Sequence, residues 1–396
     1  MLSIRDITGI GRTYRNLNRF RQILTVLLKY GFGDLLELLK LDQYVEAGLK
    51  IISRNQPIRV EKLTRPEGLR MALEELGPTY IKLGQILSTR PDLIPVDFLS
   101  ELSKLQDKVP PFPFTAVRKI IESELKFPLE KIFTHFEEQP LASASIGQVH
   151  KARLQDGKEA AVKVQRPGIE RVIEVDLEIM MYLAKLMERH IEELALHRPV
   201  KIVEEFARTL EEELDYRMEA SNMERMALNF LDDPATYIPA VYRDYSTMRV
   251  LTAEFVDGIK VSDLQQLDAA GLNRKLITDR GAEILLQQIF DLGFFQADPH
   301  PGNIFVLPDN VICLIDFGMV GSVDRRTRES FVELIDAVVR KDGYRTSQIF
   351  LEIVDREEEP DLRLLERDIA DLLQKGILRH THGGGRSTTY ELVWPK

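Results

Sequence analysis

Asp298, Asn303 and Asp316 have the residue types and the spacing needed to hold a metal ion and transfer a phosphoryl group. Asp298 and Asn303 enclose the segment Asp-Pro-His-Pro-Gly-Asn, and Asp316 opens an Asp-Phe-Gly segment thirteen residues after Asn303. In such chemistry one aspartate positions the acceptor, an asparagine five residues later holds one Mg²⁺, and the Asp-Phe-Gly aspartate holds the metal that bridges the phosphates. We therefore predict that Asp298 is catalytic and that Asn303 and Asp316 are metal ligands.

The elements around these residues can be predicted from hydrophobic patterning. Residues 311–315, Val-Ile-Cys-Leu-Ile, are apolar and partly β-branched, which predicts a buried strand ending at Asp316. Cys313, the single cysteine, lies in this run and is predicted to be a buried packing residue. Residues 272–295 are rich in Leu and Ile and predict a helix that leads to the Asp298 loop.

A second group of chemistry-bearing residues lies earlier in the chain. An Asp156-Gly157 pair between two apolar runs predicts a hairpin, whose second strand carries Lys163 in the sequence Ala-Ala-Val-Lys. A lysine at this place contacts the α and β phosphates of a nucleotide, so Lys163 is predicted to be catalytic and nucleotide-binding. The turn before it is predicted to cover the nucleotide through Ala142, Ser143, Ala144 and Ser145. Alanine keeps a Cβ where glycine has none, so this turn should be stiffer than a glycine-rich one.

A carboxylate is needed to pair with Lys163, and an acidic helical stretch supplies several. On an ideal helix Asp215 and Glu219 share a face, whereas Glu213 points elsewhere, so the two sides could serve two different lysines. Further on, residues 250–258 predict a strand running into an interlobe hinge, where Glu254 and Val256 would meet adenine through their backbone.

Composition narrows the function classes. The 396 residues carry a net charge of −10 with a pI near 5.4, which gives no support to nucleic-acid binding. No stretch reaches the roughly 18–20 apolar residues of a membrane span. Residues 1–60 predict basic, amphipathic helices. Within them, segment 20–41 is too apolar for a solvated helix, so it either docks on the protein itself or lies on an anionic membrane surface.

One further motif is ambiguous by composition alone. Lys82 and Gln85 would share a helix face, and Gly84 between them costs about 1 kcal/mol relative to alanine. Composition favours a packing glycine with two solvated neighbours, against close approach of a ligand or another backbone.

Together, the Lys82-x-Gly84-Gln85 motif, the alanine-rich turn, Lys163 and the Asp-Phe-Gly segment resemble the UbiB family of atypical protein-kinase-like proteins. The resemblance runs from about residue 20 to about residue 375. It implies that Lys82 and Gln85 are regulatory and block a protein substrate, and that Glu213 and Asp215 form an E-x-D motif engaging them. It leaves Glu219 as the partner of Lys163, with Glu213 as the competing choice.

The resemblance also implies an α+β, two-lobed protein-kinase-like fold with an N-terminal helical extension. The expected segments are N-terminal helices 1–60, a helical extension 61–131, an N-lobe 132–256, a C-lobe 257–375, and a flexible, truncated tail 376–396. Expected cofactors are ATP or ADP with Mg²⁺. The expected function is support of ubiquinone biosynthesis, with isoprenoid or quinone-precursor lipids, ubiquinone-biosynthesis proteins and a peripheral membrane surface as partners, at the cytoplasmic face of the inner membrane.

Three departures from ordinary protein kinases predict poor activity on protein substrates. Gln296 and Ala297 precede Asp298 where an arginine would read a phosphorylated activation loop, His300 replaces the usual lysine, and no Ala-Pro-Glu segment follows Asp316. Two alternatives remain open: a small-molecule phosphotransferase, against which the Lys82 motif argues, and a nucleotide-gated module that binds isoprenoid lipids without turnover.

Overall fold

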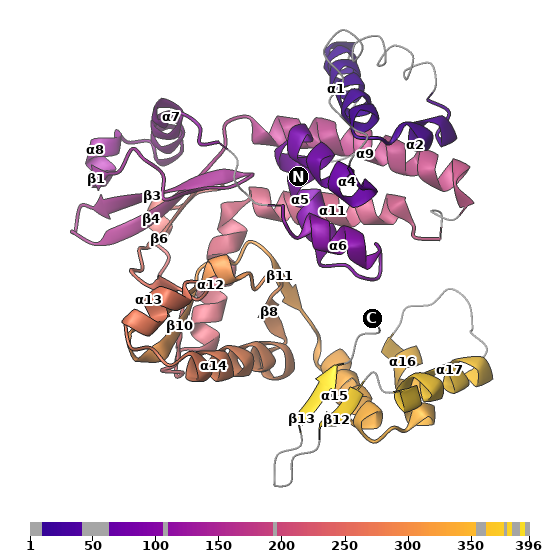
Figure 1. Cartoon of the computed structure of the whole chain (residues 1–396). Helices are drawn as coiled ribbons and strands as arrows, with labels where there is room; N and C mark the ends of the chain where they lie inside the picture. Colours follow the sequence, from indigo (N-terminus) through magenta and orange to yellow (C-terminus); the bar gives the residue numbers. More distant parts are fainter. Residues whose placement is uncertain are drawn as a thin grey trace. The chain divides into compact units, whose positions relative to one another are not determined.

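The computed structural model describes residues 10–41, 63–105, 110–192, 196–353, 362–375, 378–381 and 389–392 (Figure 1). The chain divides into two compact units. Unit 1 comprises Met1–Ala227, Ile238–Asp257 and Asp316–Gly318. Unit 2 comprises Leu228–Tyr237, Gly258–Ile315 and Met319–Lys396.

Unit 1 begins with a layer of helices around one apolar core. The helices are α1 (Ile10–Lys29), α2 (Gly33–Leu38), α4 (Arg65–Leu76), α5 (Pro78–Ser88), α6 (Val96–Leu102), α9 (Ile169–His190) and α11 (Pro199–Leu214). Ile23 and Leu24 of α1 are buried in this core with residues of α4, α9 and α11. Arg19 ties α1 to α9 by two hydrogen bonds to Asp176, of 2.7 and 3.0 Å. The sequence left two alternatives for segment 20–41, docking on the protein itself or lying on a membrane surface. Within the described residues, α1 docks on the other helices of the protein.

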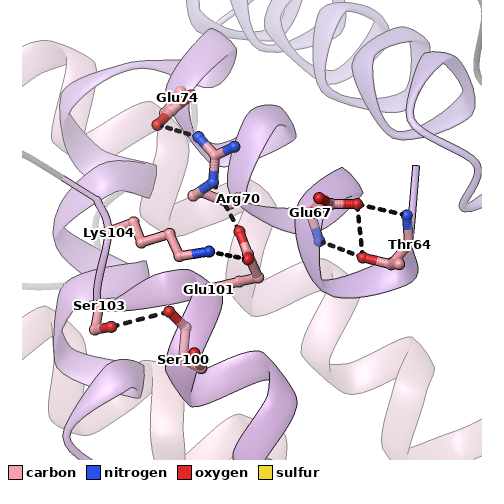
Figure 2. Close-up of polar contacts among 8 residues, drawn as sticks. All are labelled: Thr64, Glu67, Arg70, Glu74, Ser100, Glu101, Ser103 and Lys104. Carbon is pink, nitrogen blue, oxygen red and sulfur yellow. Dashed lines mark hydrogen bonds and ion pairs between the residues drawn. The ribbon is translucent and has the colours of Figure 1, made fainter. Parts of the chain in front are cut away.

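Polar contacts fix the start of α4 and its packing on α6 (Figure 2). Thr64 and Glu67 form a capping box, in which the Thr64 backbone N–H donates to the Glu67 carboxylate at 2.8 Å. Arg70 donates to Glu74 at 2.8 Å within α4 and to Glu101 of α6 at 3.2 Å. The capping box satisfies N–H groups at the start of α4, and the Arg70–Glu101 contact joins α4 to α6.

The sheet of unit 1 has five antiparallel strands. They are β1 (Phe133–Phe136), β2 (Ala142–Ser143), β3 (Gly147–Leu154), β4 (Glu159–Gln165) and β6 (Val250–Glu254), in the order β1-β3-β4-β6 with β2 also on β3. The predicted hairpin is confirmed, because β3 pairs with β4 across a turn in which Gly157 has φ 89°. Helices α7 (Phe114–Leu125) and α8 (Leu129–Ile132) share an apolar core with this sheet. The short 3₁₀ turn η2 (Arg243–Tyr245) precedes β6.

The acidic stretch is not one ideal helix, so the premise of the sequence argument is wrong, but its conclusion is confirmed: Glu213 pairs with Lys82 and Glu219 with a different lysine, Lys163. α11 ends at Leu214, and Asp215 caps it in an extended conformation with φ −104° and ψ 92°. A new helix, α12 (Tyr216–Asn229), begins immediately afterwards. Glu213 and Glu219 therefore lie on different helices, and their directions cannot be derived from a single 3.6-residue period.

Unit 2 contains a four-stranded sheet in the order β5-β10-β9-β7 and a second pair formed by β8 and β11. The strands are β5 (Thr236–Tyr237), β7 (Ile259–Lys260), β8 (Phe294–Gln296), β9 (Ile304–Leu307), β10 (Val311–Leu314) and β11 (Val320–Ser322). The turns are η4 (Pro301–Asn303) and η5 (Pro308–Asn310), and η3 (Gln287–Leu292) is π-helical. The helices are α13 (Leu264–Ala269), α14 (Arg274–Leu286), α15 (Arg325–Val339), α16 (Gly343–Ile353) and α17 (Leu362–Lys375).

Two predictions for unit 2 are confirmed: a strand, β10, precedes Asp316, and Cys313 within it is buried. Within the segment predicted as a tail, 376–396, β12 (Leu378–Thr381) and β13 (Thr389–Leu392) pair in antiparallel register. The glycine run 383–385 and the rest of this tail lie outside the described residues. Within the described ranges no helix is both long and apolar enough to cross a membrane.

Candidate active site

Lys163 and Glu219 form the central ion pair of unit 1. The Lys163 ammonium donates to both Glu219 carboxylate oxygens, at 2.9 and 2.8 Å. Strand β4 carries the lysine and α12 carries the glutamate, which is only 5% exposed. Of the two carboxylates that the sequence left in competition, the structure places Glu219 against Lys163. In protein kinases, the lysine that contacts the phosphates is paired with a glutamate in this way.

Asp316 adds a second negative charge near this lysine. Burial by itself would raise the pKa of Asp316, but the positive charge of Lys163, a hydrogen bond from the Gly318 N–H and the charge of Lys82 together lower it. That hydrogen bond measures 3.0 Å. Burial would likewise lower the pKa of Lys163, but Glu219 and Asp316 raise it. The Lys163 ammonium and the Asp316 carboxylate thus each stabilise the charged form of the other.

The regulatory motif predicted at Lys82 contacts the same region. Lys82 of α5 forms an ion pair with Glu213 of α11, and their side chains are 14% and 9% exposed. Lys82 is therefore not the solvated neighbour that composition favoured. Asp215, the other acidic residue of the predicted E-x-D motif, contacts Arg217 instead, at 2.6 and 2.8 Å. Gln85 is half-buried and makes no side-chain hydrogen bond within the described part of the chain.

Gly84 is a packing glycine. A Cβ built on it would lie 2.3 Å from a methyl carbon of Leu105 and 2.7 Å from one of Leu73. Its close neighbours are thus leucine side chains of the α4–α6 core, which agrees with the packing glycine that composition favoured. Within this four-residue motif, Gly84 therefore faces the apolar core, whereas Lys82 forms the ion pair with Glu213.

The alanine-rich turn runs from β2 to β3. Ala142 and Ser143 pair with β3, and the Ala144 N–H donates to the Gly147 carbonyl at 2.8 Å. Ser145 is buried. None of residues 142–147 has a positive φ, so alanine is tolerated here without left-handed strain.

Arg166 supports this turn and was missed in the sequence. Its guanidinium donates to the carbonyls of Pro110, at 3.0 Å, and Ala144, at 3.4 Å. Its backbone N–H donates to the Ile146 carbonyl at 2.7 Å, and the guanidinium lies over the Phe112 ring. Nothing local marks an arginine just after a strand as a support for a turn more than twenty residues earlier.

Asn222 was also missed. Its side-chain amide donates to the Phe317 carbonyl at 3.1 Å, inside the Asp-Phe-Gly segment, and Phe317 itself is fully buried. An asparagine on α12 near Glu219 thus holds the backbone that follows Asp316. The predicted hinge residues lie at the end of β6: Glu254 accepts a hydrogen bond from the Ala240 N–H at 3.2 Å, and Val256 is half-buried just before the boundary between the units.

In unit 2, Asp298 and Asn303 lie on one short loop between β8 and β9. Asp298 is exposed, and its carbonyl accepts from the His300 N–H at 2.8 Å. The Asn303 N–H donates to the His300 carbonyl at 2.9 Å, and the Asn303 carbonyl accepts from Ile315, at 3.2 Å. The His300 ring accepts from the Gly302 N–H at 3.0 Å. Local hydrogen bonds therefore fix the backbone of this loop.

The elements and ion pairs of these units define a kinase-like protein. The ABC1 atypical kinase-like domain matches residues 104–350, and the chain belongs to this family. It is 40% identical over 366 residues to a "Probable protein kinase UbiB" of Shewanella baltica, covering 90% of this chain and 66% of the relative. It is 42% identical over 301 residues to "Protein ACTIVITY OF BC1 COMPLEX KINASE 7, chloroplastic" of Arabidopsis thaliana, covering 76% and 43%.

A solved structure is also similar. The complex of Rv3197 with erythromycin from Mycobacterium tuberculosis aligns with a TM-score of 0.51 at 26% identity, covering 89% of this chain and 90% of that one. The α+β, kinase-like fold with N-terminal helices is therefore confirmed, as is the family resemblance. The chain spans about two thirds of the length of its bacterial UbiB relatives and less than half of the plant protein.

Proposed function

We propose that this chain is a Mg²⁺-dependent atypical kinase or ATPase that binds ATP and ADP and acts poorly on protein substrates. The observation that carries the proposal is the Lys163–Glu219 ion pair, at 2.8–2.9 Å, in electrostatic contact with an ionised Asp316. A structural ion pair alone would not need a third, acidic group beside the lysine. Lys163 would hold the α and β phosphates, oriented by Glu219.

The residue types predicted from the sequence to hold the metal suit magnesium. Asp316 and Asn303 offer hard oxygen ligands, and Mg²⁺ is usually bound through one or two carboxylates together with phosphate oxygens and water. Within the described ranges, no three His, Cys, Asp or Glu side chains gather as a self-sufficient metal site. When bound, Mg²⁺ would neutralise charge on the phosphates. Asp298 would position the attacking water or hydroxyl group.

The biological role follows from the family resemblance. We place the activity in ubiquinone biosynthesis, at the cytoplasmic face of the inner membrane, on a peripheral surface where isoprenoid or quinone-precursor lipids and ubiquinone-biosynthesis proteins would be partners. Lys82 and Gln85 would restrict access of protein substrates. The Lys82–Glu213 ion pair also favours a second candidate, a nucleotide-gated lipid-binding module, because it links the helical extension to the nucleotide-binding unit.

The test is steady-state ATP hydrolysis with Mg²⁺, with and without anionic liposomes. We expect hydrolysis that rises with liposomes and disappears in Asp316→Asn, while Asp309→Asn, the same change at an exposed turn residue, hydrolyses normally. Equal hydrolysis by Asp316→Asn contradicts the metal assignment. No hydrolysis by a protein that Mg²⁺-nucleotide still stabilises, by about 2.7 kcal/mol at a hundredfold excess over Kd, supports the gated module instead.

A further inference from the structure

Tyr216 is a buried side chain that packing alone does not explain. It is 1% exposed and begins α12, directly after the extended residue Asp215. Its backbone N–H donates to the Met248 carbonyl at 3.0 Å, so its position is anchored. Its hydroxyl is buried without a hydrogen-bond partner in the described part of the chain. A buried, unsatisfied hydroxyl costs free energy, so a phenylalanine would serve better if the ring only filled space.

The ring of Tyr216 faces the nucleotide lysine. The Lys163 ammonium lies 5.1 Å from the ring centroid, within the range of about 6 Å in which a cation is attracted to an aromatic face. Glu219 holds the same ammonium through two hydrogen bonds. An ammonium held only by one carboxylate could rotate about it, whereas a second contact from a rigid ring restricts that motion. Tyr216 therefore takes part in directing Lys163.

The hydroxyl end of Tyr216 meets the alanine-rich turn. A Cβ built on Gly147 would lie 2.4 Å from the Tyr216 hydroxyl and 2.7 Å from the Val164 carbonyl. In the β3–β4 register Gly147 is opposite Gln165 and Val149 is opposite Lys163, so Gly147 and Lys163 lie on the same face of the sheet. The glycine that ends the turn thus makes room for Tyr216.

We infer that Tyr216 is a positioning residue for nucleotide binding, whose ring holds the Lys163 ammonium where it meets the α and β phosphates. Its hydroxyl, packed on Gly147, sets the spacing between that lysine and the covering turn. This inference rests on the proposed function, because it requires Lys163 to contact the nucleotide.

The test is the affinity for Mg²⁺-ADP, measured by calorimetry, in a double-mutant cycle of Tyr216→Leu and Lys163→Met. We expect Tyr216→Leu to raise Kd at least tenfold in the wild-type background but less than twofold in Lys163→Met, because Tyr216 acts through the lysine. Tyr80→Leu is the matched control, since Tyr80 is also buried with an unpartnered hydroxyl, beside Arg19, and should leave Kd unchanged. Equal weakening in both backgrounds, or none, overturns the inference.

A shape-conserving comparison covers the case in which Tyr216→Leu does not fold. Tyr216→Phe keeps the ring and its negative electrostatic potential. A trifluorinated phenylalanine at this position keeps a similar shape but largely removes the negative potential of the ring face. We expect the fluorinated protein to bind Mg²⁺-ADP at least threefold more weakly than Tyr216→Phe, and equal affinities overturn the inference. If the wild-type chain binds neither ADP nor ATP, the proposed function fails and this inference fails with it. If the wild type binds but the comparisons show no difference, only the inference fails.

Discussion

Lys82 of α5 and Glu213 of α11 form a largely buried ion pair, which links the N-terminal helices to the helix that precedes α12, the helix that carries Glu219. Glu213 stays buried because Lys82 supplies its counter-charge. The two residues of the pair are far apart in the sequence. Burial raises the pKa of Glu213, and the negative charge of Asp316 contributes to this rise. The ion pair therefore joins the helical extension to the candidate active site, and its loss should be visible in both stability and pH dependence.

Lys82→Met should destabilise the protein by roughly 3–5 kcal/mol, the usual cost of removing one partner of a buried pair. Burial raises the pKa of Glu213, and Lys82 is the main group that lowers it, so the pKa should rise further in the variant. A carboxyl group whose folded pKa is raised gives stability that is complete below its unfolded value, about 4.3, and is lost as pH rises through the folded value. Urea unfolding should therefore show a larger deficit at pH 8 than at pH 5.

The double variant Lys82→Met/Glu213→Gln is the control for this pH effect. It lacks the buried carboxyl group, so it should not show the extra loss of stability that the single variant shows at pH 8. If the single and double variants show the same change between pH 5 and pH 8, the pH dependence does not come from Glu213.

Glu219→Gln should weaken Mg²⁺-ADP binding about tenfold, because an amide cannot orient the Lys163 ammonium through charge. Glu224→Gln, on the same helix, is the matched control: Glu224 pairs with Arg243 at the surface, where such pairs contribute about 0–1 kcal/mol. Calorimetric titration should show normal affinity for the control. Normal affinity in Glu219→Gln would remove the Lys163–Glu219 pair from the binding mechanism.

Arg166→Ala should loosen the alanine-rich turn, because the turn loses the guanidinium that joins the Ala144 and Pro110 carbonyls. We expect faster amide hydrogen exchange over residues 142–147 and a several-fold rise in Kd for ATP. Arg153→Ala on β3, whose guanidinium pairs with Glu159 at an exposed site, is the control. Unchanged exchange over the turn in Arg166→Ala would show that its own hydrogen bonds suffice.

Gly84→Ala should lower stability by roughly 1–3 kcal/mol, since the new methyl group enters space occupied by Leu105 and Leu73. Gly281→Ala provides the opposite case within a helix: no atom lies within 4 Å of its added Cβ, so the substitution should stabilise α14 by about 0.5–1 kcal/mol. Thermal melts of the two variants should shift in opposite directions. A neutral Gly84→Ala would mean that the leucines rearrange at no cost.

The features that depend on neighbours along the chain could be predicted from the order of residues. The strand before Asp316, the hairpin at Gly157, the strand that carries Lys163 and the buried Cys313 all follow from local apolar patterns and turn chemistry. The Asp298–Asn303 spacing and the family resemblance also come from the order of residues alone. These patterns are short, and side-chain periodicity is sufficient to interpret them.

The partners of these residues, by contrast, are seen only once the helices and strands have packed together. The family resemblance left Glu219 as the partner of Lys163 with Glu213 in competition, and the contact itself is seen only in the structure, as is the helix break at Asp215. The neighbours of Gly84 and the support that Arg166 gives to the turn likewise come from segments far away in the sequence. Such contacts are selected by the packing of whole elements and by the need to pair buried charges, and neither is encoded in the spacing of the residues themselves.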